Sequence, residues 1–204
     1  MGIASKEDLK FYISADLMMN RGYFRCSAKK KLVNLLFPDR IMDYLKVLRK
    51  TEYYINTGKT RSLGYGLARA RLSSLGMKLG FSIAPNVFGY GLVIPHYGTV
   101  VVGAGNHIGN FAVLHTSTCI TAGQKTIGDG LYLSTGGKII GDITLGDNIS
   151  VAANGVVNKS FADANQLLVG VPASVKREQP VWYIKDGEKY HSRVEKINAR
   201  AGKR

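Results

Sequence analysis

An aliphatic residue recurs at every sixth position through the middle of this chain. A helix repeats near 3.6 residues and a strand at 2.0, so neither element alone explains this period. A solenoid coil with three flat sides does, because each side is one short strand plus a corner, with one aliphatic side chain turned towards the axis. The sequence therefore predicts a stack of such coils. The two frames, separated by a one-residue slip, are Val102, Ile108, Leu114 and Ile120, then Ile127, Leu133, Ile139, Leu145, Val151 and Val157.

Glycine follows the aliphatic residue at four of the expected corners, after Val102, Ile108, Ile127 and Leu145. Tight corners favour a residue without Cβ, which supports the solenoid. Each coil buries its apolar residues only against the next coil, so the stack needs caps. We expect the segments on either side of the solenoid to supply them.

Residues 1–80 carry helical patterns instead. Ser5 followed by Asp8 is typical of a capping box, a second helix is expected to start near Asp39, and a third is expected within 62–78. The sequence is thus divided into an N-terminal α-helical domain (1–80), a β-solenoid (81–176) and an irregular or helical basic tail (177–204). The apolar stripes of the first two helices are Leu9, Tyr12, Ile13 and Leu17, then Ile41, Leu45 and Leu48.

The net charge of +14 is unevenly placed. Residues 1–80 hold 16 basic and 6 acidic side chains, residues 81–175 hold 3 and 4, and residues 176–204 hold 9 and 4. Such flanks suit an anionic partner or form an ordinary solvated surface. No nucleic-acid-binding module is recognisable, so we expect no nucleic-acid partner.

The two cysteines and the lack of a long apolar run favour a cytoplasmic protein. Cys26 and Cys119 lie far apart and form neither a metal-ligand nor a redox spacing. The N-terminus mixes both charge signs, and no stretch of about 18 apolar residues occurs. We expect no membrane span.

The repeat, written [LIV]-G-x-x-small-x, resembles that of hexapeptide-repeat acyltransferases, which implies a mainly β fold, a left-handed parallel β-helix. Three features are similar to the serine acetyltransferase branch. They are the preceding helices, the segment GYGLVIPHYGTVVVG at 89–103, and the closing motif VGVPASV at 169–175. The resemblance covers residues 81–176 in register, whereas the helices match only in position and type.

This resemblance implies transfer of an acetyl group from acetyl-CoA, as co-substrate, directly to a hydroxyl. His96 occupies the position of the family's catalytic histidine, and imidazole has a suitable pKa for taking the hydroxyl proton. The oxyanion formed in this reaction needs hydrogen-bond donors, for which backbone N–H groups of the Gly-rich solenoid wall are the candidates.

Departures from serine-specific members favour another acceptor. Pro95 replaces the acid that helps to hold the amino group of serine, Gln124 stands where a second substrate-binding histidine is found, and Ser82 aligns with the Asp that orients the imidazole. With Tyr97, Pro95 and Gln124 are the expected substrate-binding residues. The preferred acceptor is a sugar hydroxyl of a cell-surface polysaccharide, with serine as the alternative.

Acetyl-CoA in this family lies along a groove between neighbouring solenoids, past small residues. The resemblance therefore implies a homotrimer, which the helices could pair into a hexamer. The tail lacks the isoleucine by which many serine acetyltransferases dock into cysteine synthase, so that partner is not expected. The matching cofactor positions are Ala122, Gly123, Thr135, Gly136, Gly137, Ala152 and Ala153, with Lys176 and Arg177 as candidate phosphate contacts.

Two other classes of protein share parts of this pattern. Some hexapeptide solenoids bind zinc, but His96, His107 and His115 lie 11 and 8 residues apart and do not match a metal-ligand spacing, so no metal is predicted. A non-catalytic binding or scaffold solenoid stays open as an alternative.

Overall fold

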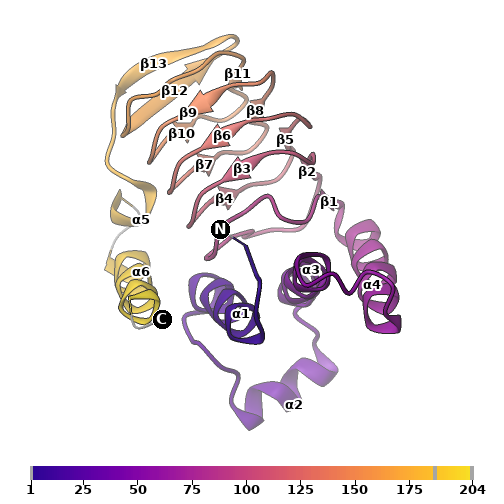
Figure 1. Cartoon of the computed structure of the whole chain (residues 1–204). Helices are drawn as coiled ribbons and strands as arrows, with labels where there is room; N and C mark the ends of the chain where they lie inside the picture. Colours follow the sequence, from indigo (N-terminus) through magenta and orange to yellow (C-terminus); the bar gives the residue numbers. More distant parts are fainter. Residues whose placement is uncertain (1, 186–187, 203–204) are drawn as a thin grey trace.

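A computed structural model describes residues 2–185 and 188–202. Four helices lie at one end of a β-solenoid, and the C-terminal helices pack along its side (Figure 1). The helices are α1 (Lys6–Arg21), α2 (Ala28–Leu36), α3 (Arg40–Asn56), α4 (Leu63–Leu79), α5 (Trp182–Lys185) and α6 (Glu188–Ala201). The strands are β1 (Phe81–Ile83), β2 (Val100–Val102), β3 (His107–Ile108), β4 (Val113–Leu114), β5 (Thr118–Ile120), β6 (Thr126–Ile127), β7 (Tyr132–Leu133), β8 (Lys138–Ile139), β9 (Thr144–Leu145), β10 (Ser150–Val151), β11 (Val156–Val157), β12 (Gln166–Gly170) and β13 (Ala173–Glu178).

The three predicted helices are confirmed, and the first two begin where the sequence predicted. Ser5 caps α1 in a reciprocal capping box with Asp8, and Asp39 and Ser62 cap α3 and α4. The sequence analysis missed α2, which Ser27 caps. Its apolar residues are exposed, so it does not follow the rule that an apolar stripe faces the core.

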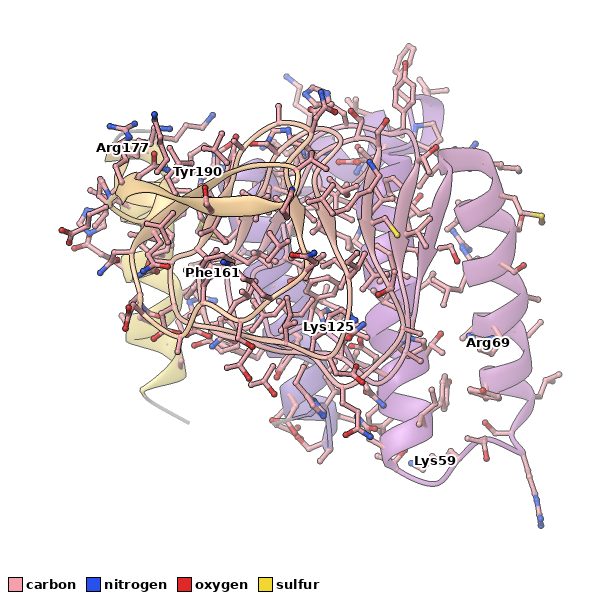
Figure 2. All side chains as sticks on the ribbon, turned by 90° about the horizontal axis from the view of Figure 1, so that it is seen from above. Lys59, Arg69, Lys125, Phe161, Arg177 and Tyr190 are labelled. Carbon is pink, nitrogen blue, oxygen red and sulfur yellow. The ribbon has the colours of Figure 1, made fainter. Side chains whose placement is uncertain are left out.

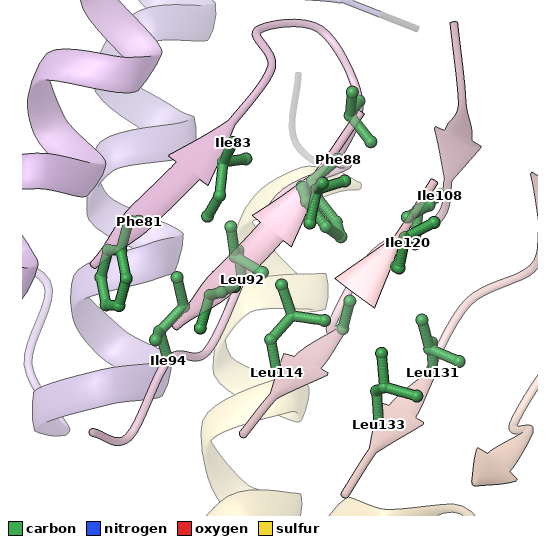
Figure 3. Packing of buried hydrophobic residues seen from close by; sticks show 14 of the residues in the cluster. Phe81, Ile83, Phe88, Leu92, Ile94, Ile108, Leu114, Ile120, Leu131 and Leu133 are labelled. Carbon is green, nitrogen blue, oxygen red and sulfur yellow. The ribbon is translucent and has the colours of Figure 1, made fainter. Parts of the chain in front are cut away.

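The solenoid has three sheets, as the six-residue period predicted. Sheet A runs β1-β2-β5-β8-β11, sheet B runs β3-β6-β9, and sheet C runs β4-β7-β10-β12-β13. All pairings are parallel except that of β12 with β13. The ten aliphatic residues of the two frames are all buried, and Figure 3 shows four of them, Ile108, Leu114, Ile120 and Leu133, inside the coils.

The corner at 121–125 absorbs the one-residue slip in the pattern. Equivalent corners at 103–106 and 140–143 are one residue shorter. The extra residue is accommodated by turning the Lys125 side chain inwards, where its Nζ donates to the backbone oxygens of Thr121 (2.9 Å) and Ala122 (3.5 Å). Figure 2 shows Lys125 and Arg177 on different sides of the solenoid.

The C-terminal segment caps the last coil and then turns back along the solenoid. The hairpin β12–β13 closes the end of sheet C, α5 packs against the outer face of that sheet at Tyr132, and α6 packs against α1 and α5. The Trp182 indole donates to the Phe111 oxygen (2.9 Å), and the Arg193 guanidinium donates to the Met19 oxygen in α1. The outer face of sheet C is therefore occupied by the chain's own tail.

The helices and the first coils share one hydrophobic core. The largest buried cluster includes Leu17 of α1, Leu48 of α3 and Leu79 of α4 together with the axis residues of the solenoid. The division at residues 80 and 176 stays a prediction, because a continuous core does not by itself separate folding units.

Candidate active site

His96 lies at the edge of the solenoid where sheet C gives way to sheet A. The corners along this edge are 94–99, 115–117, 134–137 and 152–155. Hydrogen bonds join them: the N–H of Gly136 donates to the Thr116 oxygen (3.0 Å), and that of Asn154 donates to the Thr135 oxygen (2.9 Å). We call this stack of four corners the His96 edge.

Several predicted site residues share the His96 edge. Gly136 has φ of 74°, and a Cβ there would collide with the Asn154 side chain, so the corner requires glycine. Its N–H and that of Gly137, which donates to the Ser134 oxygen, are both engaged within the edge. The predicted residues that lie here are Pro95, His96, Tyr97, Thr135, Gly136, Gly137, Ala152 and Ala153.

The His96 imidazole is exposed on this edge. In the part of the chain that the structure describes, it makes no hydrogen bond or ion pair. The corner that carries it is anchored from below, because the Gly98 N–H donates to the oxygen of Leu79 at the end of α4 (2.8 Å). Ser82, the residue aligned with the family's orienting acid, is exposed in β1 and does not hydrogen-bond to His96. The orienting partner is thus not supplied by Ser82.

The other predicted site residues lie elsewhere. Ala122, Gly123 and Gln124 are on the corner between sheets A and B, across a three-residue strand of about 10 Å from the His96 edge. The backbone N–H of Gln124 donates to Asp142 (2.7 Å). Lys176 is exposed in β13, beyond the turn that closes the His96 edge. Within one chain, the predicted residues therefore form two separate groups on either side of sheet A, with Lys176 apart from both in sheet C.

The histidines do not converge on a metal site. His107 is on sheet B and His115 packs its ring against Tyr132, with 5.1 Å between the ring centroids. Among the described residues there is no group of three or more His, Cys, Asp or Glu side chains placed to hold a metal ion.

A buried ionic network from the helices holds the segment that leads to His96. This segment belongs to the first coil, which has no coil beneath it, so its backbone groups need other partners. Arg49 of α3 is fully buried and donates to the oxygens of Phe88 (3.0 Å) and Gly89 (2.6 Å). Asp16 of α1 accepts from the N–H groups of Gly91 (2.8 Å) and Leu92 (3.0 Å).

The charged groups of this network are also paired with one another. Arg49 also donates to Asp16 through Nε (2.8 Å) and Nη2 (3.3 Å) and to Glu52 through Nη1 (3.1 Å). Burial opposes the charge of Arg49, but the two carboxylates outweigh it, and its pKa is raised. Burial raises the pKa of Glu52, which also accepts from the Asn86 N–H (2.9 Å).

Asn20 extends this support to the first residue of the corner that carries His96. Its Nδ2 donates to the Leu92 oxygen (2.8 Å), and its Oδ1 accepts from the Ile94 N–H (3.3 Å). Ile94 is two residues before His96. Helix α1 therefore holds the residues before and after Val93, which forms a parallel bridge with Val113 just before the corner that carries His96.

The sequence analysis missed Asp16, Asn20, Arg49 and Glu52. A signal was present: Asp16 and Arg49 stand among the apolar stripes of α1 and α3, and opposite charges at core positions indicate a buried pair. Their partners in the first coil are backbone groups, which leave no trace in the residue types.

The chain is similar in sequence to known serine acetyltransferases. No protein-family model matches the chain. The serine acetyltransferase of Buchnera aphidicola is 30% identical over 161 residues, which cover 74% of this chain and 54% of the relative. The serine acetyltransferase of Mycobacterium tuberculosis is 29% identical over 117 residues, covering 53% and 51%. The chain thus spans about half the length of these relatives.

Solved structures give the same result for the fold. A serine acetyltransferase in complex with CoA superposes with a TM-score of 0.65 at 22% identity, covering 83% of this chain and 70% of that one. Soybean serine acetyltransferase complexed with serine has a TM-score of 0.64 at 25% identity, covering 82% and 68%.

The fold and the His96 edge define a hexapeptide-repeat β-solenoid with a helical N-terminal region, wound as a left-handed β-helix. Within that class, the chain is serine acetyltransferase-like. The described residues contain no helix with the length and apolar character needed to cross a bilayer.

Proposed function

We propose that this chain is an acetyl-CoA-dependent O-acetyltransferase with His96 as general base. The imidazole takes the proton of the acceptor hydroxyl while that oxygen attacks the thioester carbon; the C–S bond then breaks, and CoA leaves as the thiol after receiving the proton. The relative at 30% identity carries this proposal. Because that match leaves out only about a quarter of the chain, and His96 lies farther than that from either terminus, His96 falls inside the aligned span.

Serine is the acceptor that the comparisons favour. Both curated relatives are serine acetyltransferases, and one of the superposed structures is complexed with serine. A sugar hydroxyl is the second candidate, since Pro95 and Gln124 replace the groups expected to hold serine. The sugar acceptor predicted from the sequence has gained no support from the relatives.

Acetyl-CoA binding is proposed to involve two neighbouring chains. The His96 edge and the Ala122–Gln124 corner flank sheet A, and one chain does not bring them together. The tail occupies the outer face of sheet C, whereas Val101 and Cys119 on the outer face of sheet A are only half-buried. A trimer whose CoA groove joins the His96 edge of one chain to the 121–125 corner of the next would reunite the predicted residues.

That cysteine synthase is not a partner stays a prediction. Through Gly202 the described tail ends in α6, which packs Val194 and Ile197 into the aromatic cluster beside α1. A cytoplasmic location stays a prediction.

The acceptor can be identified by CoA release. We expect thiol release from acetyl-CoA to rise at least about tenfold with L-serine over the rate without acceptor, and less with free or nucleotide-linked sugars. D-serine and glycine serve as controls, because they test recognition of the configuration and the hydroxyl. A larger rate with any sugar would replace serine by the second candidate, and no acceptor-dependent release would favour a scaffold.

A further inference from the structure

Helix α2 exposes most of its apolar side chains to solvent, whereas an amphipathic helix of a globular protein buries them. Leu32, Leu35 and Leu36 are 65%, 77% and 73% exposed, and Phe37, at the end of the helix, is 76% exposed. Helices of globular proteins normally bury such a stripe against the core. The described chain leaves it uncovered, at the end of the molecule opposite the solenoid (Figure 1).

The polar side of α2 faces the protein. Lys30 and Asn34 are four residues apart and therefore share one side of the helix. The Lys30 ammonium lies 3.6 Å from the centre of the Tyr23 ring, and Asn34 lines a cavity of about 540 Å³ beneath α2, together with Leu17 and Asp43. Leu35 also lines this cavity, although most of its side chain is exposed. The contacts of Lys30 and Asn34 thus hold the polar side of α2 towards the protein and leave Leu32, Leu36 and Phe37 outside the cavity.

Basic residues border the apolar stripe without acidic neighbours. Arg25 and Lys29 are exposed, and residues 17–38 contain no Asp or Glu. The next two acids are already paired, Asp39 with Arg21 and Asp43 with Lys46 (3.9 Å). A surface that covers α2 must therefore accept both apolar side chains and positive charge.

We propose that α2 docks on an anionic lipid surface. Short helices with an apolar face and a basic border lie in the headgroup region, with the apolar side chains inserted and the cations near lipid phosphates. Nine residues span about 14 Å, too short to cross a bilayer, so the helix would lie on the surface. A second copy fits less well, because two such faces would bring Arg25 and Lys29 together without a free acid.

Vesicle co-sedimentation of the full chain tests this proposal. We expect binding to vesicles of phosphatidylglycerol and phosphatidylcholine, little binding to phosphatidylcholine alone, and weaker binding at high salt. Leu36→Asp should lower the partition coefficient about tenfold or more, and Lys29→Glu should lower it severalfold. Leu67→Asp on α4 is the matched control, since Leu67 is also exposed (63%) but lies outside α2, and it should bind like the wild type.

Three results would overturn the proposal. The first is that the wild type does not bind anionic vesicles. The second is that both α2 variants bind them as the wild type does. The third is that the wild type does not bind lipid and Leu36→Asp lowers the light-scattering mass of the particle. The last result would make α2 a subunit contact. Acetyl transfer in solution is not expected to change in these variants, so a failure here leaves the proposed reaction unaffected.

Discussion

Replacing His96 by Asn is expected to lower kcat for acetyl transfer about 100- to 10,000-fold, the range for loss of a general base. The side chain is exposed and makes no hydrogen bond or ion pair with the described residues, so the fold should be preserved. The KM for acetyl-CoA should change little, because the small residues of the His96 edge remain. Thiol release under saturating acetyl-CoA and acceptor measures kcat, and circular dichroism checks the fold.

The matched control for this variant is His191→Asn. His191 is exposed in α6 and lies 4.0 Å from Glu195, away from the His96 edge. It should retain wild-type kcat. Equal rates in the wild type and His96→Asn would remove His96 as the base, whatever the acceptor.

Replacing Arg49 by Met is expected to lower the free energy of unfolding by about 3–5 kcal/mol, because it leaves two buried carboxylates without their cation. The oxygens of Phe88 and Gly89 would also lose their donor. Urea unfolding at one fixed protein concentration measures the loss, since an oligomer's stability depends on concentration.

Lys50→Met is the control for the Arg49 variant. Lys50 is the next residue of the same helix and is exposed, so the same new side chain should change stability by no more than about 0.5 kcal/mol. A loss below about 1 kcal/mol in Arg49→Met would show that the first coil does not depend on the network.

The solenoid was predictable because its sequence pattern is short and repeats along the chain. Each aliphatic residue of the six-residue frames faces the axis wherever it stands, so one rule applies to Val102 and Val157 alike. The one-residue slip after Ile120 was visible in the sequence, but the way in which the structure accommodates the extra residue was not. The inward turn of Lys125 depends on the oxygens of Thr121 and Ala122, which every residue type carries.

The candidate site was predictable only in part. The segment around His96 resembles a known motif, whereas the groups that hold it come from Asp16, Asn20 and Arg49, far away in sequence. These residues act on backbone atoms of the first coil, and such contacts depend on how the helices pack beneath it. Helix α2 was missed although its signals are local, an N-cap at Ser27 and leucines at helical spacing.

The most direct test of the account is a crystal structure of the protein with CoA bound. We expect the thiol end of CoA against the His96 imidazole and the pantetheine along Thr135–Gly137 and Ala152–Ala153, in a groove completed by the 121–125 corner of a second chain. CoA bound away from the His96 edge, or a His96 imidazole with no access to the thiol, would contradict the account.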